Sequence, residues 1–465
     1  MKTAYIRTTR LLATLLNSMA LLLLCACQHT QLQFEPVTAP VLADFSLRVP
    51  DDLPPFPLIR ADMSNVSLHR IDELTVDFRL NGAYLVLTTP ATPIKNADLL
   101  ARALGALARL SAIEGDACAE ALTIKARLHS LSFFSPCDSP DTLKLRADSL
   151  MNGIGQLSDR EFDRIVREQK LARHIEAFTG SDIDRLWAQI ALGKSHPYLD
   201  YNKPFTGDKS TLEQGMNRLK SQARWQLLGH KLPATLPADS ISAVKPQHTP
   251  QRPQIPRLLT PVSTGLKQLY LLDAPGQVQA QVRLGYALAP EGNNRTCMAM
   301  AALLGRSQSG RLFYDLRSQR GLTYGVYGSC IDNPLSRTLK FYGASANEST
   351  GAFVRGIVDH LALLANDSAT TAELDALESF LAGQQKLTAD SPGSAIVGWL
   401  EALERGLQMP EVETLPPDRA ALTEFGSLIL SQPPLIVLKG DAAKIAEDLQ
   451  AKLPGWQLNI INSAQ

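Results

Sequence analysis

The chain has 465 residues, of which 45% are hydrophobic and 6% aromatic. Once an N-terminal targeting segment is set aside, a chain of this length is expected to form two globular domains that each bury a core. Its 46 basic and 46 acidic residues balance, so no basic footprint indicates a nucleic-acid partner, and we predict none.

Residues 1–26 have the features of a bacterial export signal. Lys2, Arg7 and Arg10 precede an apolar run that is short for a membrane span. The run ends in Leu-Cys-Ala-Cys, which resembles a lipobox, so Cys27 is the predicted lipid-bearing N-terminus. An ordinary secretory signal cut nearby is the alternative, and both interpretations place the protein outside the cytoplasm. Gln28 after the cysteine favours the bacterial outer membrane, with the protein anchored by its lipid and facing the periplasm.

A proline-rich tether is predicted at residues 27–62, and a first domain at residues 63–230. Its opening has the alternating or continuous apolar pattern of strands, at Val66–Ile71, Leu74–Leu80 and Ala83–Thr88. Amphipathic helical patterns follow at Ala97–Ile113, Ala117–His129, Asp141–Leu157 and Asp159–Phe178.

A second proline-rich stretch, residues 231–266, is predicted to be a linker to a second domain at residues 267–465. Strands are expected at Leu269–Leu272, Ala280–Leu288 and from Leu435 to Gly440. Thr370 and Glu373 have the spacing of a capping box at the start of a helix. The helices predicted here are Arg295–Leu304, Thr350–Leu364, Ala372–Leu387, Ile396–Gly406, Asp418–Ser427 and Ala442–Leu453.

The stretch from Leu304 to Ala346 changes its period at a glycine. Leu312 and Leu316 stand four apart, as on one helix face, and Gly321 follows where a left-handed cap residue belongs. The pattern then alternates, which is typical of a strand, and Thr338–Ala346 supplies a second strand across a turn. This return of the chain can bring Arg317, late in the helix, close to Tyr324, early in the strand.

The run from Arg311 to Arg317, RLFYDLR, followed by RGLTYG from Arg320, resembles a known signature. It is similar to the C-terminal domain of the insulinase and pitrilysin-type (M16) zinc peptidases and their non-catalytic relatives. The resemblance implies that Arg317 and Tyr324 bind the substrate by holding its scissile carbonyl, with Phe313 as the accompanying aromatic residue. A surface hydrogen bond between the Arg and the Tyr is the alternative.

The resemblance also implies a fold class. It is α+β, with two related domains that each pack an antiparallel sheet against helices, as in LuxS and the mitochondrial processing peptidase. The similarity is weak over residues 65–230 and strong over residues 267–460.

The chain departs from active M16 peptidases at the metal site. Those enzymes carry His-x-x-Glu-His on the helix that corresponds to Ala97–Ile113, and this motif occurs nowhere in the chain. None of its eight histidines lies within one helical turn of another, so we predict no metal site and no cofactor in this chain. Glu168 or Glu176 could stand in the place of the family's distal Glu, but a solvated helix face explains them better.

Four cysteines remain beside Cys27, and an even count outside the cytoplasm favours disulfides. Pairing within each half is the simplest choice, although four cysteines permit three connectivities. A metal site is the poorer interpretation because the spacings are long. The candidate disulfide residues are Cys118, Cys137, Cys297 and Cys330.

Two hypotheses of function follow. In the first, the chain is the zinc-less subunit of a heteromeric M16 peptidase, inactive alone. Its partner would carry the His-x-x-Glu-His motif and the zinc, and the substrate would be a peptide or unfolded polypeptide. In the second, the chain is a membrane-tethered peptide-binding or assembly scaffold of M16 ancestry without catalysis. A peptidase that works alone through an unfamiliar metal site is the remaining alternative.

Overall fold

The structure is a computed structural model that describes most of the chain from Leu68 onward. The described residues are 68–71, 74–112, 115–178, 180–201, 203–231, 242–244, 266–288, 294–306, 310–366, 369–408, 410 and 419–462. The predicted export signal, Cys27 and the tether lie outside these residues, as does most of the predicted linker. No helix in the described ranges combines the length and the apolar character that a membrane crossing requires.

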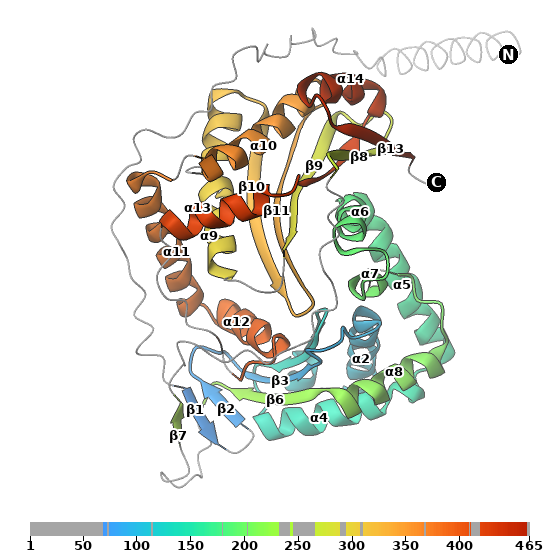
Figure 1. Cartoon of the computed structure of the whole chain (residues 1–465). Coiled ribbons are helices and arrows are strands. Elements are labelled where there is room, and N and C mark those ends of the chain that lie inside the picture. Colours follow the sequence, from blue (N-terminus) through green and yellow to red (C-terminus); the bar gives the residue numbers. More distant parts are fainter. Residues whose placement is uncertain are drawn as a thin grey trace, which may run out of the picture. The chain divides into compact units, whose positions relative to one another are not determined.

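The first half of the chain forms a seven-stranded sheet with the order β4-β5-β3-β6-β2-β1-β7. Figure 1 labels β1, β2, β3, β6 and β7 of this sheet. Its central strand β3 is buried along its whole length, as its unbroken apolar run predicts. The elements are β1 (Leu68–Ile71), β2 (Leu74–Asp77), β3 (Ala83–Thr88), α2 (Ala97–Ser111), α3 (Ala117–Glu120), β4 (Thr123–Ala126), β5 (Ser130–Ser135), α4 (Pro140–Asn152), η2 (Ile154–Gln156), α5 (Asp159–Phe178), α6 (Ser181–Leu192), α7 (Tyr198–Tyr201), α8 (Lys209–Gln222), β6 (Arg224–Gly229) and β7 (Ser242–Val244).

The second half forms a six-stranded sheet with the order β10-β11-β9-β12-β8-β13. Thr370 and Glu373 form the predicted capping box at the start of α11. The elements are β8 (Gln268–Asp273), β9 (Gln279–Leu288), α9 (Asn294–Gly305), η5 (Phe313–Gln319), β10 (Thr323–Asn333), β11 (Ser336–Ala346), η6 (Asn347–Ser349), α10 (Thr350–Asn366), α11 (Thr371–Asp390), α12 (Pro392–Glu404), α13 (Arg419–Leu430), β12 (Leu435–Gly440), α14 (Ala442–Lys452) and β13 (Gln457–Asn462).

The two sheets repeat one topology. The order β4-β5-β3-β6-β2 of the first corresponds strand by strand to β10-β11-β9-β12-β8 of the second. In both, the pair that joins the last two of these strands is parallel, while the other pairs are antiparallel. The predicted fold class, two related α+β units, is confirmed, but both sheets are mixed and not purely antiparallel as predicted.

Several elements differ from the sequence-based prediction. The helix predicted over Ala117–His129 is wrong, because α3 ends at Glu120 and β4 then pairs with β5. Pairing of Ile124 with Phe133 buries more apolar surface than a short surface helix could. Strand β7 lies inside the predicted linker and pairs with β1, and β13 was not predicted.

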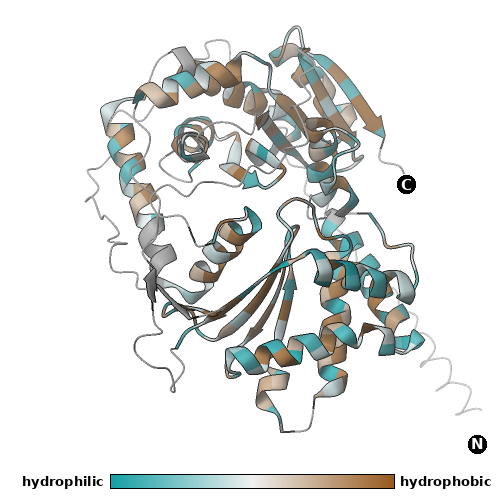
Figure 2. Ribbon diagram, turned by 60° about the horizontal axis from the view of Figure 1, so that its bottom comes forward, coloured by the Kyte–Doolittle hydropathy of each residue, from teal (hydrophilic) through white to brown (hydrophobic). Residues whose placement is uncertain are grey.

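Hydrophobic residues from the strands and from most of the helices form a core in each half, and Figure 2 shows the hydrophobic residues of the strands and helices in brown. In the first half, α2 and α4 pack against the sheet through Leu99, Leu104 and Leu143. In the second half, α9, α10 and α14 do so through Leu304, Phe353 and Ile445. One face of each sheet is thereby covered by helices of the same half.

The opposite face of each sheet is covered by a helix from the other half. Helix α6 of the first half packs Ile183 and Trp187 against Val437 of β12. Helix α12 of the second half packs Trp399 and Leu403 against the face of the first sheet that includes Val86. Helix α6 follows α5 as α12 follows α11, so α6 and α12 are equivalent helices in the repeated topology. Each packs on the sheet of the other half, and this exchange joins the two halves.

Ion pairs fix the exchanged helix α6 on the second sheet. Asp184 accepts from Arg283 at 3.0 Å and from Lys340 at 2.7 Å, and Asp182 pairs with Lys439 at 2.6 Å. Each pair is partly buried, which strengthens it relative to one in water. The register of α6 on β9, β11 and β12 is therefore set by charge as well as by apolar contact.

A buried polar network joins the tips of the β4-β5 and β10-β11 hairpins. His129 lies 2.8 Å from the Thr89 carbonyl through Nδ1 and 2.8 Å from the Tyr198 hydroxyl through Nε2. That hydroxyl accepts from the backbone N–H of Leu335 at 2.9 Å. His196 accepts from the backbone N–H of Tyr198 through Nδ1 at 3.2 Å, and Nε2 lies 3.3 Å from the Leu335 carbonyl. His196 accepts a hydrogen bond through Nδ1, so this ring is neutral; a neutral His129 can donate from Nδ1 to the Thr89 carbonyl and accept from the Tyr198 hydroxyl at Nε2.

Mild acid is expected to weaken this junction. Burial lowers the pKa values of His129 and His196, whereas the pKa of an unfolded histidine is about 6.5. The unfolded state thus binds more protons, so the stability that these groups provide is present above about pH 6.5 and is lost below it. Burial raises the pKa of nearby Glu404, which acts in the opposite direction. We expect the urea midpoint to fall between about pH 7.5 and about pH 5.5, and to fall less when both histidines are replaced by Gln; equal falls would contradict this assignment.

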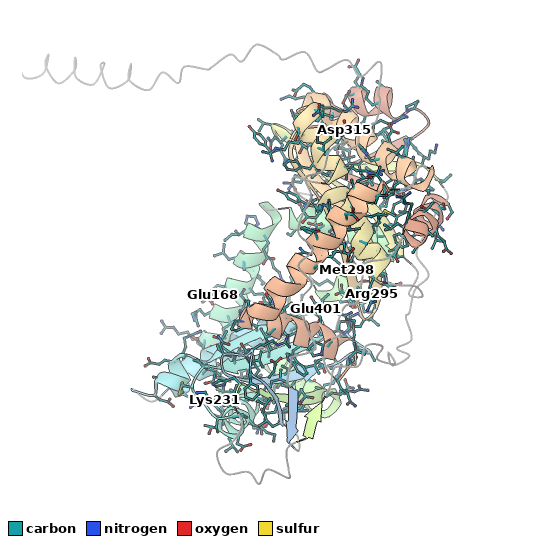
Figure 3. The ribbon with its side chains drawn as sticks, turned by 90° about the vertical axis from the view of Figure 1, so that its left-hand side faces the viewer. Glu168, Lys231, Arg295, Met298, Asp315 and Glu401 are labelled. Atoms are coloured by element: carbon teal, nitrogen blue, oxygen red, sulfur yellow. A yellow bond between two sulfur atoms is a disulfide. The ribbon has the colours of Figure 1, made fainter. Side chains whose placement is uncertain are left out.

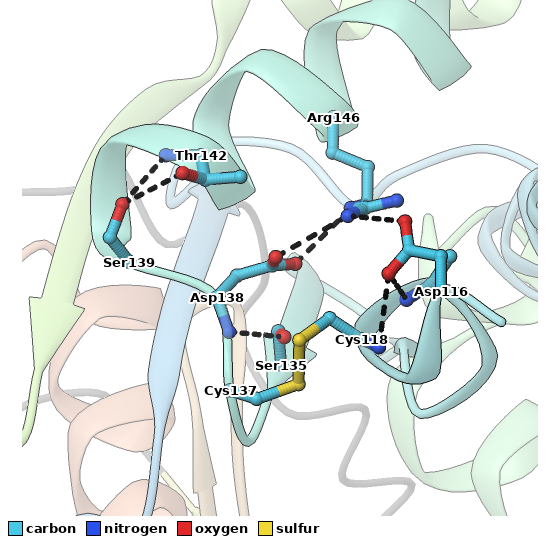
Figure 4. A network of polar contacts seen from close by, with 9 residues as sticks. Asp116, Cys118, Ser135, Cys137, Asp138, Ser139, Thr142 and Arg146 are labelled. Atoms are coloured by element: carbon cyan, nitrogen blue, oxygen red, sulfur yellow. Dashed lines mark hydrogen bonds and ion pairs between the residues drawn. A yellow bond between two sulfur atoms is a disulfide. The ribbon is translucent and has the colours of Figure 1, made fainter.

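The described residues form two disulfides, each within one half. Cys118 is bonded to Cys137, and Cys297 to Cys330, which is the simplest pairing named above. Figure 4 shows the first, beside an ion-paired cluster in which Arg146 donates to Asp138 at 3.1 Å and to Asp116 at 3.2 Å. The second ties α9 to the end strand β10.

Candidate substrate-binding site

The helix predicted from Leu312 and Leu316 continues as a π-helix, η5, which carries Arg317. Gly321 ends it with the left-handed φ of 66° that its position predicts. The N–H of Gly321 donates to the Arg317 carbonyl at 3.0 Å, and that of Leu322 to the Leu316 carbonyl at 2.8 Å. The chain thus turns back from η5 directly into β10, as expected. Wide π turns are rare and frequently occur at functional sites.

Buried contacts seat η5 on helix α10. The Asp315 carboxylate accepts from Arg320 Nε at 2.8 Å and lies 3.0 Å from His360 Nε2 on α10. Asp315 and His360 are buried, and the position of Asp315 is marked in Figure 3. A Cβ on Gly356 of α10 would lie 2.3 Å from the Cδ2 atom of Leu316, so a larger residue there would force the Leu316 side chain to shift. The backbone that carries Arg317 is therefore held rigidly.

A second buried ion pair holds the start of the same helix. Arg311 donates to both carboxylate oxygens of Glu373, at 2.5 and 2.8 Å. Burial raises the pKa of this carboxyl, but the hydrogen bond from Arg311 and its charge outweigh burial, so the pKa is lowered overall. Burial also lowers the pKa of the neighbouring Arg306 to about 10, against the opposing charge of Glu373. The Glu373 carboxylate is thus the counter-charge of two buried guanidinium groups, those of Arg311 and Arg306.

Arg317 lies across the ring of Phe313. Its guanidinium carbon is 4.5 Å from the ring centroid, and Phe313 is itself buried in the second core. Contact with an aromatic face orients a guanidinium without using its N–H groups. Within the described part of the chain, the ring is the only partner of this exposed side chain, so its donors remain free.

Tyr324 projects from a β-bulge at the start of β10. The pairing of β10 with β11 shifts between Thr323 and Val326. The Thr323 hydroxyl holds the bulge, because it accepts from the Gly325 N–H at 3.1 Å and lies 2.5 Å from the Ala344 carbonyl. A bulge redirects side chains. Here the Tyr324 side chain is 83% exposed, and its hydroxyl has no partner among the described residues.

The structure therefore places the predicted pair on adjoining elements, Arg317 at the end of η5 and Tyr324 at the start of β10. The two side chains do not contact each other in the described structure. Both side chains are exposed, and no hydrogen bond joins them among the described residues. Such an arrangement can donate hydrogen bonds to an oxygen-bearing ligand.

The supporting residues Asp315, His360 and Arg320 were not identified from the sequence. Asp315 and His360 are 45 residues apart, and Arg311 and Glu373 are 62 apart. The capping-box spacing of Glu373 was visible, but it indicated only a helix start. No local pattern connects these partners, because tertiary packing pairs them.

The residues of the first half do not fit a zinc site of the M16 type. Helix α2, which corresponds to the family's metal-binding helix, contains no histidine. Glu168 on α5 is exposed and paired with Arg164. Among the described residues, no group of three or more His, Cys, Asp or Glu side chains could hold a metal ion.

Residues 231–381 match the family described as the Peptidase M16 inactive domain, so this part of the chain is similar to that family. The crystal structure of a peptidase M16 inactive domain from Pseudomonas fluorescens is similar in fold, with a TM-score of 0.52 at 15% identity over 81% of this chain and 98% of that one.

Two bacterial proteins are similar in sequence. The chain is 30% identical over 118 residues to the uncharacterized zinc protease YmxG of Bacillus subtilis, and this match covers 25% of the chain but only 29% of that protein. It is 25% identical over 308 residues to the uncharacterized zinc protease MT2852 of Mycobacterium tuberculosis, which covers 63% of the chain and 67% of that protein. The chain thus matches less than a third of the length of the first relative.

Proposed function

We propose that the chain is the zinc-less subunit of a heteromeric M16-type peptidase, in which Arg317 and Tyr324 bind the substrate peptide. The observation that carries this proposal is their arrangement, two rigidly mounted side chains with free donors in an inactive-type domain. The chain contains no His-x-x-Glu-His motif, whereas two of its relatives are named zinc proteases. The metal therefore belongs to a partner chain that has the motif.

The role of this chain's residues is to bind and orient. Arg317 and Tyr324 donate hydrogen bonds to the carbonyl oxygen of the peptide bond that is cut, and they retain this contact as negative charge develops there. The Phe313 ring keeps the guanidinium in place, and the Thr323-held bulge keeps the phenol in place. Preorganised donors lower the barrier because they need no rearrangement during the reaction.

We further propose that Cys27 is lipidated and anchors the protein at the outer membrane, facing the periplasm. Its substrates are then peptides or unfolded polypeptides of that compartment. Labelling with an azido fatty acid tests the anchor, since replacing Cys27 by Ser should abolish incorporation.

Replacing Tyr324 by Phe is expected to lower the rate of peptide cleavage by the assembled pair by about 10²–10³-fold, the usual effect of losing one oxyanion donor. The measurement mixes the chain with a motif-bearing M16 protein from the same genome and follows cleavage of a fluorogenic peptide. The chain alone should cut nothing, and gel filtration should show that the variant still assembles.

Tyr314→Phe is the matched control, because Tyr314 lies on η5 and also loses only a hydroxyl. An unchanged rate in Tyr324→Phe would remove the role assigned to this residue. If no motif-bearing partner restores cleavage although the chain binds peptides, the protein is a scaffold.

A further inference from the structure

One pair of residues closes the π turn of η5 twice. The backbone N–H of Arg320 donates to the Asp315 carbonyl at 3.0 Å, a bond that spans five residues, as in a π-helix. The Arg320 side chain donates through Nε to the carboxylate of the same aspartate at 2.8 Å. In an α-helix the N–H of Arg320 would bond to the carbonyl of Leu316, four residues back, but here that carbonyl accepts from the N–H of Leu322 at 2.8 Å. The contacts of Asp315 therefore hold this turn wide.

Two consecutive residues of this turn contact helix α10. Gly356 and His360 lie four apart, so they are neighbours on one face of α10. Leu316 lies against Gly356, and Asp315 lies against His360, with 3.0 Å between Oδ2 and Nε2. Asp315 and Leu316 are buried, and Arg317, the next residue, is exposed. The direction in which Arg317 leaves the turn therefore depends on how its two predecessors are held.

His360 contributes one hydrogen bond to this arrangement. Because the Asp315 carboxylate is paired with the Arg320 guanidinium, it is ionised and can only accept. His360 Nε2 therefore carries a proton and is the donor. The other ring nitrogen of His360, Nδ1, is buried and has no partner among the described residues. Each oxygen of the carboxylate thus receives one donor, Oδ1 from Arg320 and Oδ2 from His360.

The repeated topology provides an internal comparison. Helix α3 of the first half lies between α2 and β4, as η5 lies between α9 and β10. Asp116 at the start of α3 accepts from Arg146 of α4 at 3.2 Å, and Cys118 is held by the disulfide in Figure 4. An aspartate that contacts a basic side chain of a later helix thus occurs in both halves. In the first half the segment is an α-helix of four residues without an arginine, whereas in the second it is a π-helix from which Arg317 projects.

We propose that Asp315 and His360 are positioning residues, which direct Arg317 toward the substrate carbonyl by holding the π turn of η5. When the His360 donor is removed, the Asp315 carboxylate keeps one of its two donors, and the turn can tighten to α-helical bonding. The Arg317 guanidinium then points in another direction. Tyr324 keeps its place, because the β-bulge that carries it is held by contacts of β10 with β11. The inference rests on the proposed function for the ligand of Arg317, but not for the geometry of the turn.

Two variants of His360 separate donation from packing. In His360→Gln the side-chain amide retains a donor close to the place of Nε2, whereas His360→Phe retains a ring and has no donor. His360→Phe should lower kcat/KM of the assembled pair about tenfold or more, because a small misplacement of a positioned group is costly, and His360→Gln should stay within about threefold of the unmodified chain. If the ring acts only by filling space, Phe is tolerated better than Gln, and that order would overturn the proposal.

A double-mutant cycle identifies the residue through which His360 acts. In an Arg317→Ala background, His360→Phe should change kcat/KM by less than about twofold, because the group that it positions is gone. In a Tyr324→Phe background the full effect of His360→Phe should remain. An effect that persists beside Arg317→Ala, or that also vanishes beside Tyr324→Phe, contradicts the role assigned to His360.

The turn itself is tested in the full-length chain without a partner or a substrate. Hydrogen exchange is followed by mass spectrometry over residues 313–322. The amides of Arg320 and Leu322 should exchange about tenfold faster in His360→Phe than in the unmodified chain, because the turn opens more often. In His360→Gln they should exchange at the unmodified rate. The amides of β11 are the internal control and should not change.

The two experiments distinguish this proposal from the proposed function. If exchange in the turn is unchanged by His360→Phe, the positioning role is wrong, whatever happens to cleavage. If exchange responds as expected but no partner restores cleavage, the proposed function fails and the geometry of the turn stands. If the urea transition shows that His360→Phe does not fold, Asp315→Asn replaces it in both experiments with the same expected results, since it keeps the volume and removes the charge that Arg320 and His360 contact.

Discussion

Replacing Glu373 by Ala is expected to lower the free energy of unfolding by about 3–5 kcal/mol, the usual cost of breaking a buried ion pair from one side. Arg311 would remain as a buried cation and would lose its two hydrogen bonds to the Glu373 carboxylate, at 2.5 and 2.8 Å. Arg306 would lose the same counter-charge. The capping box with Thr370 would disappear as well. Urea unfolding followed by circular dichroism measures the effect.

The Glu373 result has two controls. Asp375→Ala on the same helix, at an exposed position, should change stability by less than about 0.5 kcal/mol. The double variant Arg311→Met with Glu373→Leu should recover part of the loss, because it removes the Arg311 charge together with its partner and retains the volume, while Arg306 stays without its counter-charge. A double variant as unstable as Glu373→Ala would show that packing, and not the unpaired cation, causes the loss.

Replacing Trp399 by Ala is expected to cost about 3–5 kcal/mol, the typical cost of emptying a large buried aromatic site. Trp399 is completely buried, and its indole N–H donates to Asp77 of the first sheet at 2.8 Å. Because this side chain belongs to α12, its loss acts on the contact between the halves. Limited proteolysis should then release fragments that the unmodified chain does not release.

Trp399→Phe separates packing from the hydrogen bond. It keeps most of the ring, and Asp77 retains its pair with Arg79 at 2.7 Å, so its cost should be about 1–2 kcal/mol. Val397→Ala on the exposed side of α12 is the surface control. If Trp399→Ala unfolds at the same denaturant concentration as Val397→Ala, then α12 does not contribute to the union of the halves.

Periodic segments could be predicted from the sequence because local forces determine them. Strand β3 and helix α5 have the predicted boundaries, and Gly321 has the predicted left-handed conformation. The prediction of a helix over Ala117–His129 was wrong. The residues of this segment suit a helix, but pairing of β4 with β5 determines its structure. Such non-local pairing has no signature in a single segment.

The candidate site could likewise be predicted only where a local pattern determines it. A predicted helix, a glycine and a predicted strand place Arg317 and Tyr324 on the two sides of a turn. The sequence therefore predicts that the two residues lie near each other. The π turn, the bulge held by Thr323 and the carboxylate of Asp315 did not, because each depends on packing against another strand or helix. The sequence thus indicated Arg317 and Tyr324 as candidate donors, but not the contacts that hold their backbone.

The exchange of α6 and α12 has a consequence for experiments that dissect the chain. A gene fragment that begins after the linker would encode a sheet without its covering α6 and an α12 without its apolar partner. Such a product would expose two apolar surfaces, the uncovered face of the second sheet and the apolar side of α12, and is expected to aggregate. Loss of function on truncation would therefore report misfolding, so the contributions of the two halves are better separated by point substitutions in the intact chain.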